Sequence, residues 1–309
     1  MKIVMYSPNR YSTPRIGVLY KDLVIDLVES YRMIYNSEPP TWFYDIGDFF
    51  SSPYTFKIVE EILGSISKRS FEEKIFTHDP EKIIYHPPTS KDQRIFCLAL
   101  NYRSHVEESG RPKPERPYIF LKTKSALIGH RQPILIPKVS KSPDHEVELG
   151  VVIGRKGKYI NRSNAMEYVA GYTIVNDISF RDWQMRSQQG LGLDWLHGKN
   201  MDSSTPVGPY VVTKDEIDDP YSLELILRVN DEVRQKGSSS EMIFSIEEII
   251  EEITQGIKIL PGDLISTGTP AGVGHVRKIY LKDGDIVEAE ISRIGVLANP
   301  LTSSPALES

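Results

Sequence analysis

Alternating hydrophobic and polar residues mark several short segments of this chain. Residues 222–229 and 286–291 place an apolar side chain at about every second position, the period of a strand with one buried face. Turn-forming residues adjoin both segments, Asn230-Asp231 after the first and Asp283-Gly284-Asp285 before the second. The pattern predicts a β-dominated body in which most neighbouring strands run antiparallel.

The first part of the chain is predicted to form a small β-rich unit. Residues 15–20 and 23–27 are two strand-like segments, and Lys21-Asp22 between them predicts a hairpin. A proline-rich connection then interrupts the pattern, because proline removes a backbone donor and restricts its neighbours. We therefore expect a small N-terminal domain over residues 1–88 and a larger domain over residues 89–309.

Apolar residues at helical spacing predict two helices. One lies near residues 56–66, where isoleucine and leucine recur along one face. The other begins after Ser245, which forms a capping-box pattern with Glu248. Its apolar stripe runs over residues 246–257, and Gly256 marks the end. This second helix carries no reactive residue and is expected to be a scaffold element.

Composition and charge narrow the class of protein. The 309 residues carry a formal net charge of −5, and no run of Lys and Arg predicts binding to nucleic acid or to a membrane. Cys97 is the only cysteine, which excludes a disulfide framework and a cysteine-based zinc site, and it is predicted to be a packed core residue. The N-terminal apolar stretch is too short for a signal peptide and no segment approaches a membrane span, so we expect a cytoplasmic protein.

The segment 144–154 holds the most informative pair of residues in the chain. Glu146 and Glu148 precede an apolar run and, in a strand, would project to the same face. Two neighbouring carboxylates repel each other and are costly to remove from water, and a bound cation resolves both problems. A solvated strand end is the alternative reading of the same two residues.

A further acidic residue ends a second apolar strand. The apolar segment 171–177 ends at Asp177. A third carboxylate at this place would complete an all-oxygen site of the kind preferred by Mg²⁺, Mn²⁺ or Ca²⁺. An ordinary turn after the strand is the alternative at this position.

Two further features offer reactive side chains. On a helix, His105 and Glu108 would face each other at i and i+3, and a carboxylate beside imidazole supports a general base for water. Lys199 and Thr269 lie in two glycine-bearing loops, and Lys199 could bind an anionic substrate or a developing enolate. An incidental ion pair and a solvated lysine are the alternatives. No nucleophile elbow, phosphate loop or dinucleotide fingerprint is present in the sequence.

Taken together and in their order along the chain, these features resemble the fumarylacetoacetate hydrolase family. The resemblance covers about residues 94–300, and the segments 119–129, 176–184 and 199–209 carry its most specific matches. It implies a mainly β (α+β) fold, a mixed β-sandwich roll with a few peripheral helices and a small N-terminal β-rich domain. It also implies a homodimer, because members of the family are typically dimeric.

The resemblance implies a metal site and a catalytic dyad. Glu146, Glu148 and Asp177 would bind a divalent cation, usually Mg²⁺ or Mn²⁺. His105 and Glu108 would activate water, on a segment that in this family often becomes ordered as a lid when substrate binds.

The resemblance also implies the substrate contacts. Lys199, Gln184 and Thr269 would contact the substrate or its developing negative charge, and Tyr102 and Arg103 are further substrate-binding candidates. The family's eukaryotic founder has an additional acidic ligand upstream and a longer C-terminal insertion, neither of which has an obvious match here. The pattern is therefore closer to bacterial and archaeal members that act on acylpyruvates or on hydroxymuconate-type ring-cleavage products.

The favoured function is a divalent-metal-dependent hydrolase of C–C bonds in acylpyruvate-like or diketo-acid-like 2-oxo acids. Such a substrate would chelate the metal, the dyad would deprotonate water, and the metal and Lys199 would hold the expelled enolate. Without the water step, the same site supports isomerisation or decarboxylation of 2-hydroxymuconate-type diacids in aromatic catabolism. A 2-oxo acid binding protein without turnover is the alternative outside enzymes.

Overall fold

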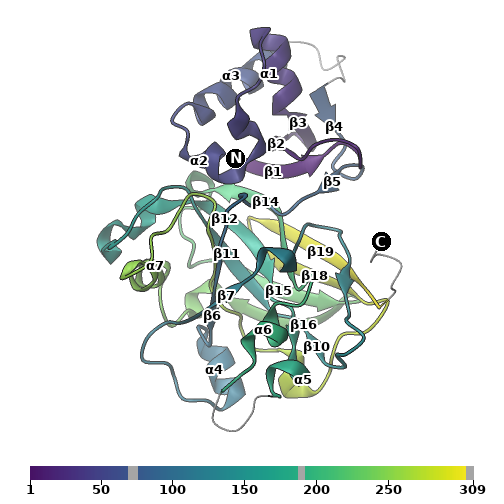
Figure 1. Ribbon diagram of the computed structural model, residues 1–309, viewed down its shortest axis with the longest axis vertical. Helices are drawn as coiled ribbons and strands as arrows, with labels where there is room; N and C mark the ends of the chain where they lie inside the picture. The colour runs from purple at the N-terminus through teal and green to yellow at the C-terminus, as the bar shows by residue number, and fades with distance from the viewer. Residues whose placement is uncertain (69–75, 187–191, 304–309) are drawn as a thin grey trace.

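The computed structural model describes residues 1–68, 76–186 and 192–303, which form a mixed α+β fold built mainly from strands (Figure 1). Its large sheet has the order β4-β3-β2-β1-β14-β12-β11-β17-β6-β7. In chain order, these strands are β1 (Lys2–Ser7), β2 (Arg15–Tyr20), β3 (Leu23–Asp26), β4 (Thr77–His78), β6 (Ile95–Ala99), β7 (Tyr118–Lys122), β11 (Val147–Ile153), β12 (Val169–Asn176), β14 (Thr205–Thr213) and β17 (Leu264–Ser266). Two short strands join its side, β5 (Ile84–Tyr85) on β1 and β8 (Leu127–Ile128) on β14.

A second sheet of five strands has the order β16-β15-β18-β19-β9. Its strands are β9 (Ile134–Leu135), β15 (Glu224–Val229), β16 (Glu232–Ser238), β18 (Ile286–Ile291) and β19 (Gly295–Thr302). The two alternating segments predicted from the sequence are β15 and β18, which pair antiparallel, although β15 starts two residues later than the pattern predicts. Parallel pairing is confined, among the described strands, to β14 with β8, β17 with β6 and β19 with β9.

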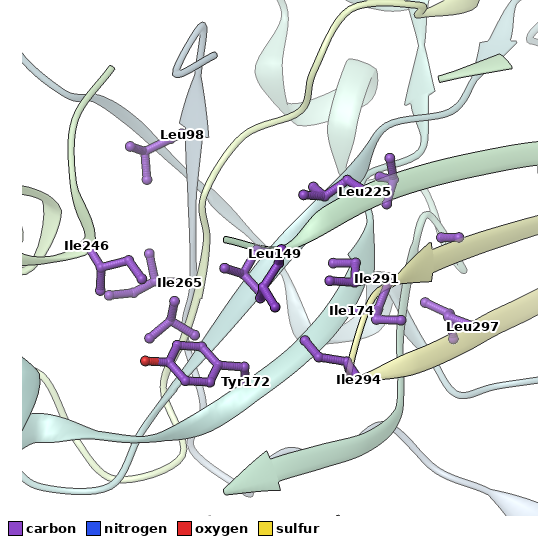
Figure 2. Close-up of a cluster of buried hydrophobic side chains, with 14 of the residues drawn as sticks. Leu98, Leu149, Tyr172, Ile174, Leu225, Ile246, Ile265, Ile291, Ile294 and Leu297 are labelled. Carbon is purple, nitrogen blue, oxygen red and sulfur yellow. The ribbon is translucent and has the colours of Figure 1, made fainter. Parts of the chain in front are cut away.

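The two sheets pack face to face around the main hydrophobic core. Leu149 of β11 and Ile174 of β12 meet Leu225, Ile291 and Leu297 of the second sheet, and all five side chains are buried (Figure 2). Side chains alternate along a strand, so the next residues of β11 and β12 point to the opposite face of the large sheet. That opposite face carries the candidate carboxylates.

The N-terminal unit adds helices to the opposite face. Strands β1 to β4 extend the large sheet, because β1 pairs antiparallel with β14. Helices α1 (Leu27–Tyr35), α2 (Ile46–Ser51) and α3 (Thr55–Lys68) lie over this part, at the top of Figure 1. Phe49 and Ile62 from the helices share a buried cluster with Val152 and Val175 of the central strands. The predicted division at residue 88 stays a prediction, since one sheet runs through both parts.

Local sequence signals agree with the observed turns and helix starts. Lys21 and Asp22 have φ values of 48° and 63°, the positive values of a two-residue hairpin turn. Strand β3 ends at Asp26, one residue before the predicted end, because the Asp26 side chain caps α1. Helix α3 confirms the helix expected near residues 56–66.

The capping box at Ser245 is present in α7 (Ile246–Thr254). The helix ends before Ile257, which is 46% exposed, so the predicted stripe extends beyond the helix. Cys97 is buried in β6, as predicted. Within the described parts of the chain, no helix is long and apolar enough to cross a membrane.

Candidate active site

Strand register places the three predicted metal ligands together. Val147 of β11 lies opposite Asn176 of β12, and the Asp177 N–H donates to the Glu146 carbonyl oxygen at 2.9 Å just beyond the paired residues. Asp177 therefore lies across from Glu146, and Glu148 shares the face of Glu146 by strand alternation. All three carboxylates are buried, and one oxygen from each lies within 4.8 Å of the others.

Buried cations hold two of these carboxylates in place. The Lys199 ammonium, at the end of α6 (Trp195–Lys199), donates to Glu146 Oε2 at 2.6 Å and to Asp177 Oδ2 at 2.7 Å. Lys122 of β7 pairs with the other oxygen of Asp177 and donates to the Ser204 carbonyl at 2.9 Å. Both ammonium groups are buried, and each donates to at least two oxygen atoms, which is the condition under which a buried charge is tolerated.

Arg181 pairs with the remaining oxygen of Glu146. It begins α5 (Arg181–Gln184), and its Nε donates to Asp144 Oδ2 at 2.8 Å. Asp144 belongs to the short strand β10 (Pro143–Asp144), which pairs with β13 (Ser179–Phe180). Although burial raises the pKa of Glu146, the charges of Lys199 and Arg181 outweigh it and hold this pKa well below its ordinary value.

Glu148 differs from its neighbours because no cation pairs with it among the described residues. Its Oε2 accepts hydrogen bonds from Ser266 Oγ at 2.6 Å and from the Gly268 N–H at 2.9 Å. Gly268 has a φ of +93°, a backbone conformation that favours glycine. Burial, together with the charges of Asp177 and Glu146, raises the pKa of Glu148 to about 8.

These residues fit a hard divalent cation. The three carboxylates Glu146, Glu148 and Asp177 supply only oxygen ligands, the donor set that Mg²⁺, Mn²⁺ and Ca²⁺ prefer. The raised pKa of Glu148 means that its surroundings disfavour the ionised carboxylate, and a cation bound at this point would favour it. The predicted metal ligands are therefore brought together, and their chemistry suits a divalent metal site.

The predicted dyad lies in the same pocket. His105 and Glu108 lie on α4 (Arg103–Ser109), with His105 Nδ1 and Glu108 Oε2 3.7 Å apart. The Gly272 N–H donates to both oxygens of Glu108, at 3.0 and 2.9 Å. Burial raises the pKa of Glu108, but the nearby His105 imidazole and the hydrogen bonds from the Gly272 N–H outweigh it, so this pKa lies below its ordinary value. Glu108 is thus an ionised anchor that faces the imidazole.

Two predicted substrate contacts line the pocket but already have protein partners. Gln184 is buried, and its Oε1 accepts from Arg181 Nη1 at 2.9 Å, which leaves its amide nitrogen for other partners. The Thr269 hydroxyl donates to the Val147 carbonyl at 2.8 Å and accepts from Gln235 Nε2 at 2.9 Å. Thr269 therefore faces the site as part of its wall.

The other two predicted contacts lie elsewhere. Tyr102 is fully buried in the main core, and its ring is absent from the lining of the pocket. The Arg103 guanidinium donates to the carbonyl oxygens of Ser240, at 2.6 Å, and Met242, at 3.3 Å, and it too is outside the lining. A role of Tyr102 and Arg103 in substrate binding stays a prediction.

Sequence reasoning missed three charged residues of the site: Lys122, Arg181 and Asp144. All three are buried and joined to the carboxylate cluster. Lys122 and Arg181 fall within the segments that carry the family resemblance, which is the signal that could have selected them. Taken singly, a lysine or arginine is most often solvated, so nothing else in the sequence distinguishes them.

The pocket itself has a volume of about 400 Å³, in the range of small-molecule sites. Glu146, Glu148 and Lys199 form its inner end, His105 and Glu108 contribute to its wall, and part of it opens to solvent. A small anionic molecule bound there would contact the candidate metal site and the dyad together.

Comparisons of the sequence with known proteins identify a matching family and similar proteins. Residues 94–302 match the family described as Fumarylacetoacetate (FAA) hydrolase C-terminal. The human mitochondrial oxaloacetate tautomerase FAHD2A is 40% identical over 237 residues, which cover 76% of this chain and 74% of the human protein.

Two crystal structures share the fold over nearly the whole chain. The 2-hydroxyhepta-2,4-diene-1,7-dioate isomerase from Mycobacterium marinum has a TM-score of 0.72 and 28% identity, covering 98% of both chains. The maleylpyruvate hydrolase from Sphingobium sp. SYK-6 has a TM-score of 0.73 and 25% identity, covering 98% of this chain and 99% of the other.

Proposed function

This chain belongs to the fumarylacetoacetate hydrolase family, and we propose that it is a divalent-metal-dependent enzyme that interconverts the keto and enol forms of a 2-oxo acid. Oxaloacetate is the first substrate to test, because a relative 40% identical over three quarters of the chain is named an oxaloacetate tautomerase. The observation that carries the proposal is that Glu146 and Glu148 line one pocket with Lys199, His105 and Glu108. Asp177 lies close enough to both glutamates to complete a candidate metal site with them.

Mg²⁺ or Mn²⁺ is the proposed cofactor, with Ca²⁺ as the alternative. Glu146, Glu148 and Asp177 would hold it. When bound, the ion supplies a Lewis acid that polarises the 2-oxo group of the substrate and stabilises negative charge on its oxygen.

The protein's own residues would move the proton. Because His105 Nδ1 faces Glu108, the other ring nitrogen, Nε2, would take a proton from the carbon beside the 2-oxo group. The Lys199 ammonium, held by Glu146 and Asp177, would donate a hydrogen bond to the oxygen that becomes negative. Return of a proton to that oxygen gives the enol, and the reverse sequence regenerates the ketone.

Hydrolysis of C–C bonds in acylpyruvate-like 2-oxo acids is the second candidate. It is favoured by the same dyad, since a histidine oriented by a carboxylate is what activation of water requires. In this reaction His105 would take a proton from water, the hydroxide would attack the distal carbonyl carbon, and the C–C bond would break to leave a carboxylic acid and an enolate. The likeness to a maleylpyruvate hydrolase supports this candidate.

Two further alternatives from the sequence remain. Isomerisation or decarboxylation of 2-hydroxymuconate-type diacids is supported by the likeness to the Mycobacterium marinum isomerase. Retention of a 2-oxo acid without turnover is the non-enzymatic alternative. A homodimer, which the family resemblance implies, can be tested independently by light scattering.

Product analysis separates these candidates. Metal-stripped protein is reloaded with Mg²⁺ or Mn²⁺, and proton NMR then follows oxaloacetate and a panel of acylpyruvates. Tautomerisation accelerates exchange between keto and enol forms without changing their equilibrium ratio, whereas hydrolysis yields pyruvate and a carboxylic acid.

A matched pair of variants tests the dyad. His105→Gln should lower the rate of whichever reaction is observed by 10²-fold or more, the range of general acid–base catalysis. The control is Glu107→Gln, because Glu107 is exposed on the same helix and does not line the pocket. Full turnover by the His105 variant would refute the assigned role, and no accelerated reaction with any substrate would refute the proposed function.

A further inference from the structure

Gln235 is a buried amide whose hydrogen-bonding positions are all filled. It lies on β16, an edge strand of the second sheet, and is 1% exposed. Its Oε1 accepts from the Val147 N–H at 3.1 Å and from His145 Nδ1 at 3.2 Å. Its Nε2 donates to Thr269 Oγ1 and to the Pro270 carbonyl oxygen, both at 2.9 Å. Because the Val147 N–H can only donate and the Pro270 carbonyl can only accept, these partners fix the orientation of the amide.

The oxygen of this amide holds the strand between two metal ligands. Val147 lies between Glu146 and Glu148, and one edge of β11 pairs there with β12. On the other edge, β17 pairs with β11 farther along the strand. At Val147 this edge is met by side chains: Gln235 accepts from the N–H, and Thr269 Oγ1 donates to the carbonyl oxygen at 2.8 Å. These two side chains therefore supply the backbone bonds that a neighbouring strand would otherwise make beside the metal ligands.

The nitrogen of the amide holds the loop 268–274, whose last residue begins α8 (Gly274–Arg277). Backbone N–H groups of this loop donate to three carboxylates of the site. The bonds run from Gly268 to Glu148 at 2.9 Å, from Gly272 to Glu108 at 3.0 and 2.9 Å, and from Gly274 to Asp144 at 2.6 Å. One loop thus contacts a metal ligand, the dyad and the carboxylate that pairs with Arg181.

The loop also packs closely against β16. A Cβ atom at Gly272 would collide with the Arg234 carbonyl oxygen, and one at Gly237 would collide with the Pro270 ring. Gln235 lies on the strand between these two contacts and bonds to β11 as well as to the loop. Its side chain therefore links the position of the loop to the position of β11.

We propose that Gln235 is a positioning residue that fixes the metal ligands and the dyad relative to each other. It does not line the pocket, so it acts through Val147 and the loop rather than on the substrate. This role rests on the proposed function, because it takes the metal ligands and His105 as the reacting groups. A displacement of about 1 Å in a reacting group can lower a rate on the order of 10²-fold.

Gln235→Met tests this role, because methionine has a similar length and forms none of these hydrogen bonds. With the full-length, Mg²⁺-loaded protein, kcat should fall by about 10- to 100-fold while KM stays within about threefold. Electron paramagnetic resonance of metal-stripped protein titrated with Mn²⁺ should show about tenfold weaker binding of the ion. Loss of a purely structural contact would lower stability and leave kcat and Mn²⁺ affinity unchanged.

Gln235→Asn is a second variant, which decides the question if the methionine variant does not fold. It keeps the amide group, but its side chain is one methylene shorter and cannot reach both β11 and the loop. We expect kcat and Mn²⁺ affinity to fall in this variant too. Circular dichroism establishes that each variant is folded before these quantities are compared.

The matched control is Asn299→Leu. Asn299 is a 1% exposed amide on β19 of the same sheet, and it does not line the pocket. Its Nδ2 donates to the carbonyl oxygens of Gly129, at 2.9 Å, and Gln132, at 2.8 Å. The control should keep kcat, KM and Mn²⁺ affinity. Unchanged kcat and Mn²⁺ affinity in the folded Gln235 variants would overturn the role, and so would equal losses in the control.

Mn²⁺ binding distinguishes this failure from failure of the proposed function. If the unmodified protein and the Gln235 variants convert substrate and bind Mn²⁺ equally well, the proposed function stands and the positioning role is refuted. If no substrate is converted, but Gln235→Met weakens Mn²⁺ binding and Asn299→Leu does not, the positioning of the metal ligands stands and the proposed function is refuted.

Discussion

Asp144 is the buried anchor on which the arrangement of Arg181 depends, and replacing it with Asn tests that dependence. Asp144 is 0% exposed. Its Oδ1 accepts from the backbone N–H groups of His145, at 2.8 Å, and Gly274, at 2.6 Å. Its Oδ2 accepts from Arg181 Nε at 2.8 Å and from the His275 N–H at 3.0 Å. Asparagine offers one acceptor oxygen, so its amide group would face one pair of these donors.

The cost follows from these contacts. Breaking a buried ion pair by removing one partner costs about 3–5 kcal/mol, because the other charge is left uncompensated. A buried donor without an acceptor costs about 1–3 kcal/mol, and this cost overlaps with the first, since Arg181 Nε belongs to both. We therefore expect Asp144→Asn to lower the free energy of unfolding by about 3–5 kcal/mol.

Urea denaturation, followed by tryptophan fluorescence and by far-ultraviolet circular dichroism, measures this change. Asp182→Asn is the control, since Asp182 is exposed and accepts hydrogen bonds from three uncharged groups. These are Ser140 Oγ and the Lys141 N–H, both at 2.7 Å, and the Trp183 N–H at 3.2 Å. The control should lose no more than about 1 kcal/mol. A loss below about 1 kcal/mol for Asp144→Asn, or one equal to that of the control, would refute the reasoning.

Other predictions concern parts of the molecule away from the metal ligands. Burial raises the pKa of Asp26, but hydrogen bonding from His78 and the charge of Arg15 hold it below its ordinary value, so its ionised form stabilises the fold. That stability is present above the unfolded pKa of about 3.9 and is lost as the pH falls through the lower folded pKa, so unfolding curves of Asp26→Asn should depend less on pH in this range. Ser245→Ala removes the cap of α7 and should cost about 1 kcal/mol in urea denaturation, whereas an unchanged midpoint would contradict the capping role. Burial raises the pKa of the Cys97 thiol well above its ordinary value, so a thiol reagent should modify it only when urea unfolds the protein.

Several local features of the structure could be predicted from residues that lie close together in the sequence. The turn at Lys21-Asp22 and the cap at Ser245 depend on residues at most three positions apart in the chain, so the sequence alone predicts them. The positions of Glu146 and Glu148 on one face follow from strand alternation in the same way. The hydrophobic pattern did not predict α1, whose start depends on the Asp26 side chain turning back onto the helix.

The rest of the site required long-range structure. Asp177 reaches Glu146 only through the pairing of β11 with β12, a register that no local pattern specifies. Lys122 and Arg181 are buried because strands and short helices distant in the chain enclose them, although the same residue types are usually exposed. Residue type and strand position suggested these carboxylates with other interpretations left open, and the family resemblance then implied all three as ligands of one ion.

The central claim is that the three buried carboxylates Glu146, Glu148 and Asp177 hold the divalent ion on which activity toward a 2-oxo acid depends. The most direct test titrates Mn²⁺ into metal-stripped protein and records, in the same samples, bound Mn²⁺ by electron paramagnetic resonance and the rate of oxaloacetate keto–enol exchange. We predict that activity rises in proportion to bound Mn²⁺ until one ion per chain is bound, and that Glu148→Gln loses both together. Full activity of the metal-stripped protein in the presence of a chelator would contradict the account.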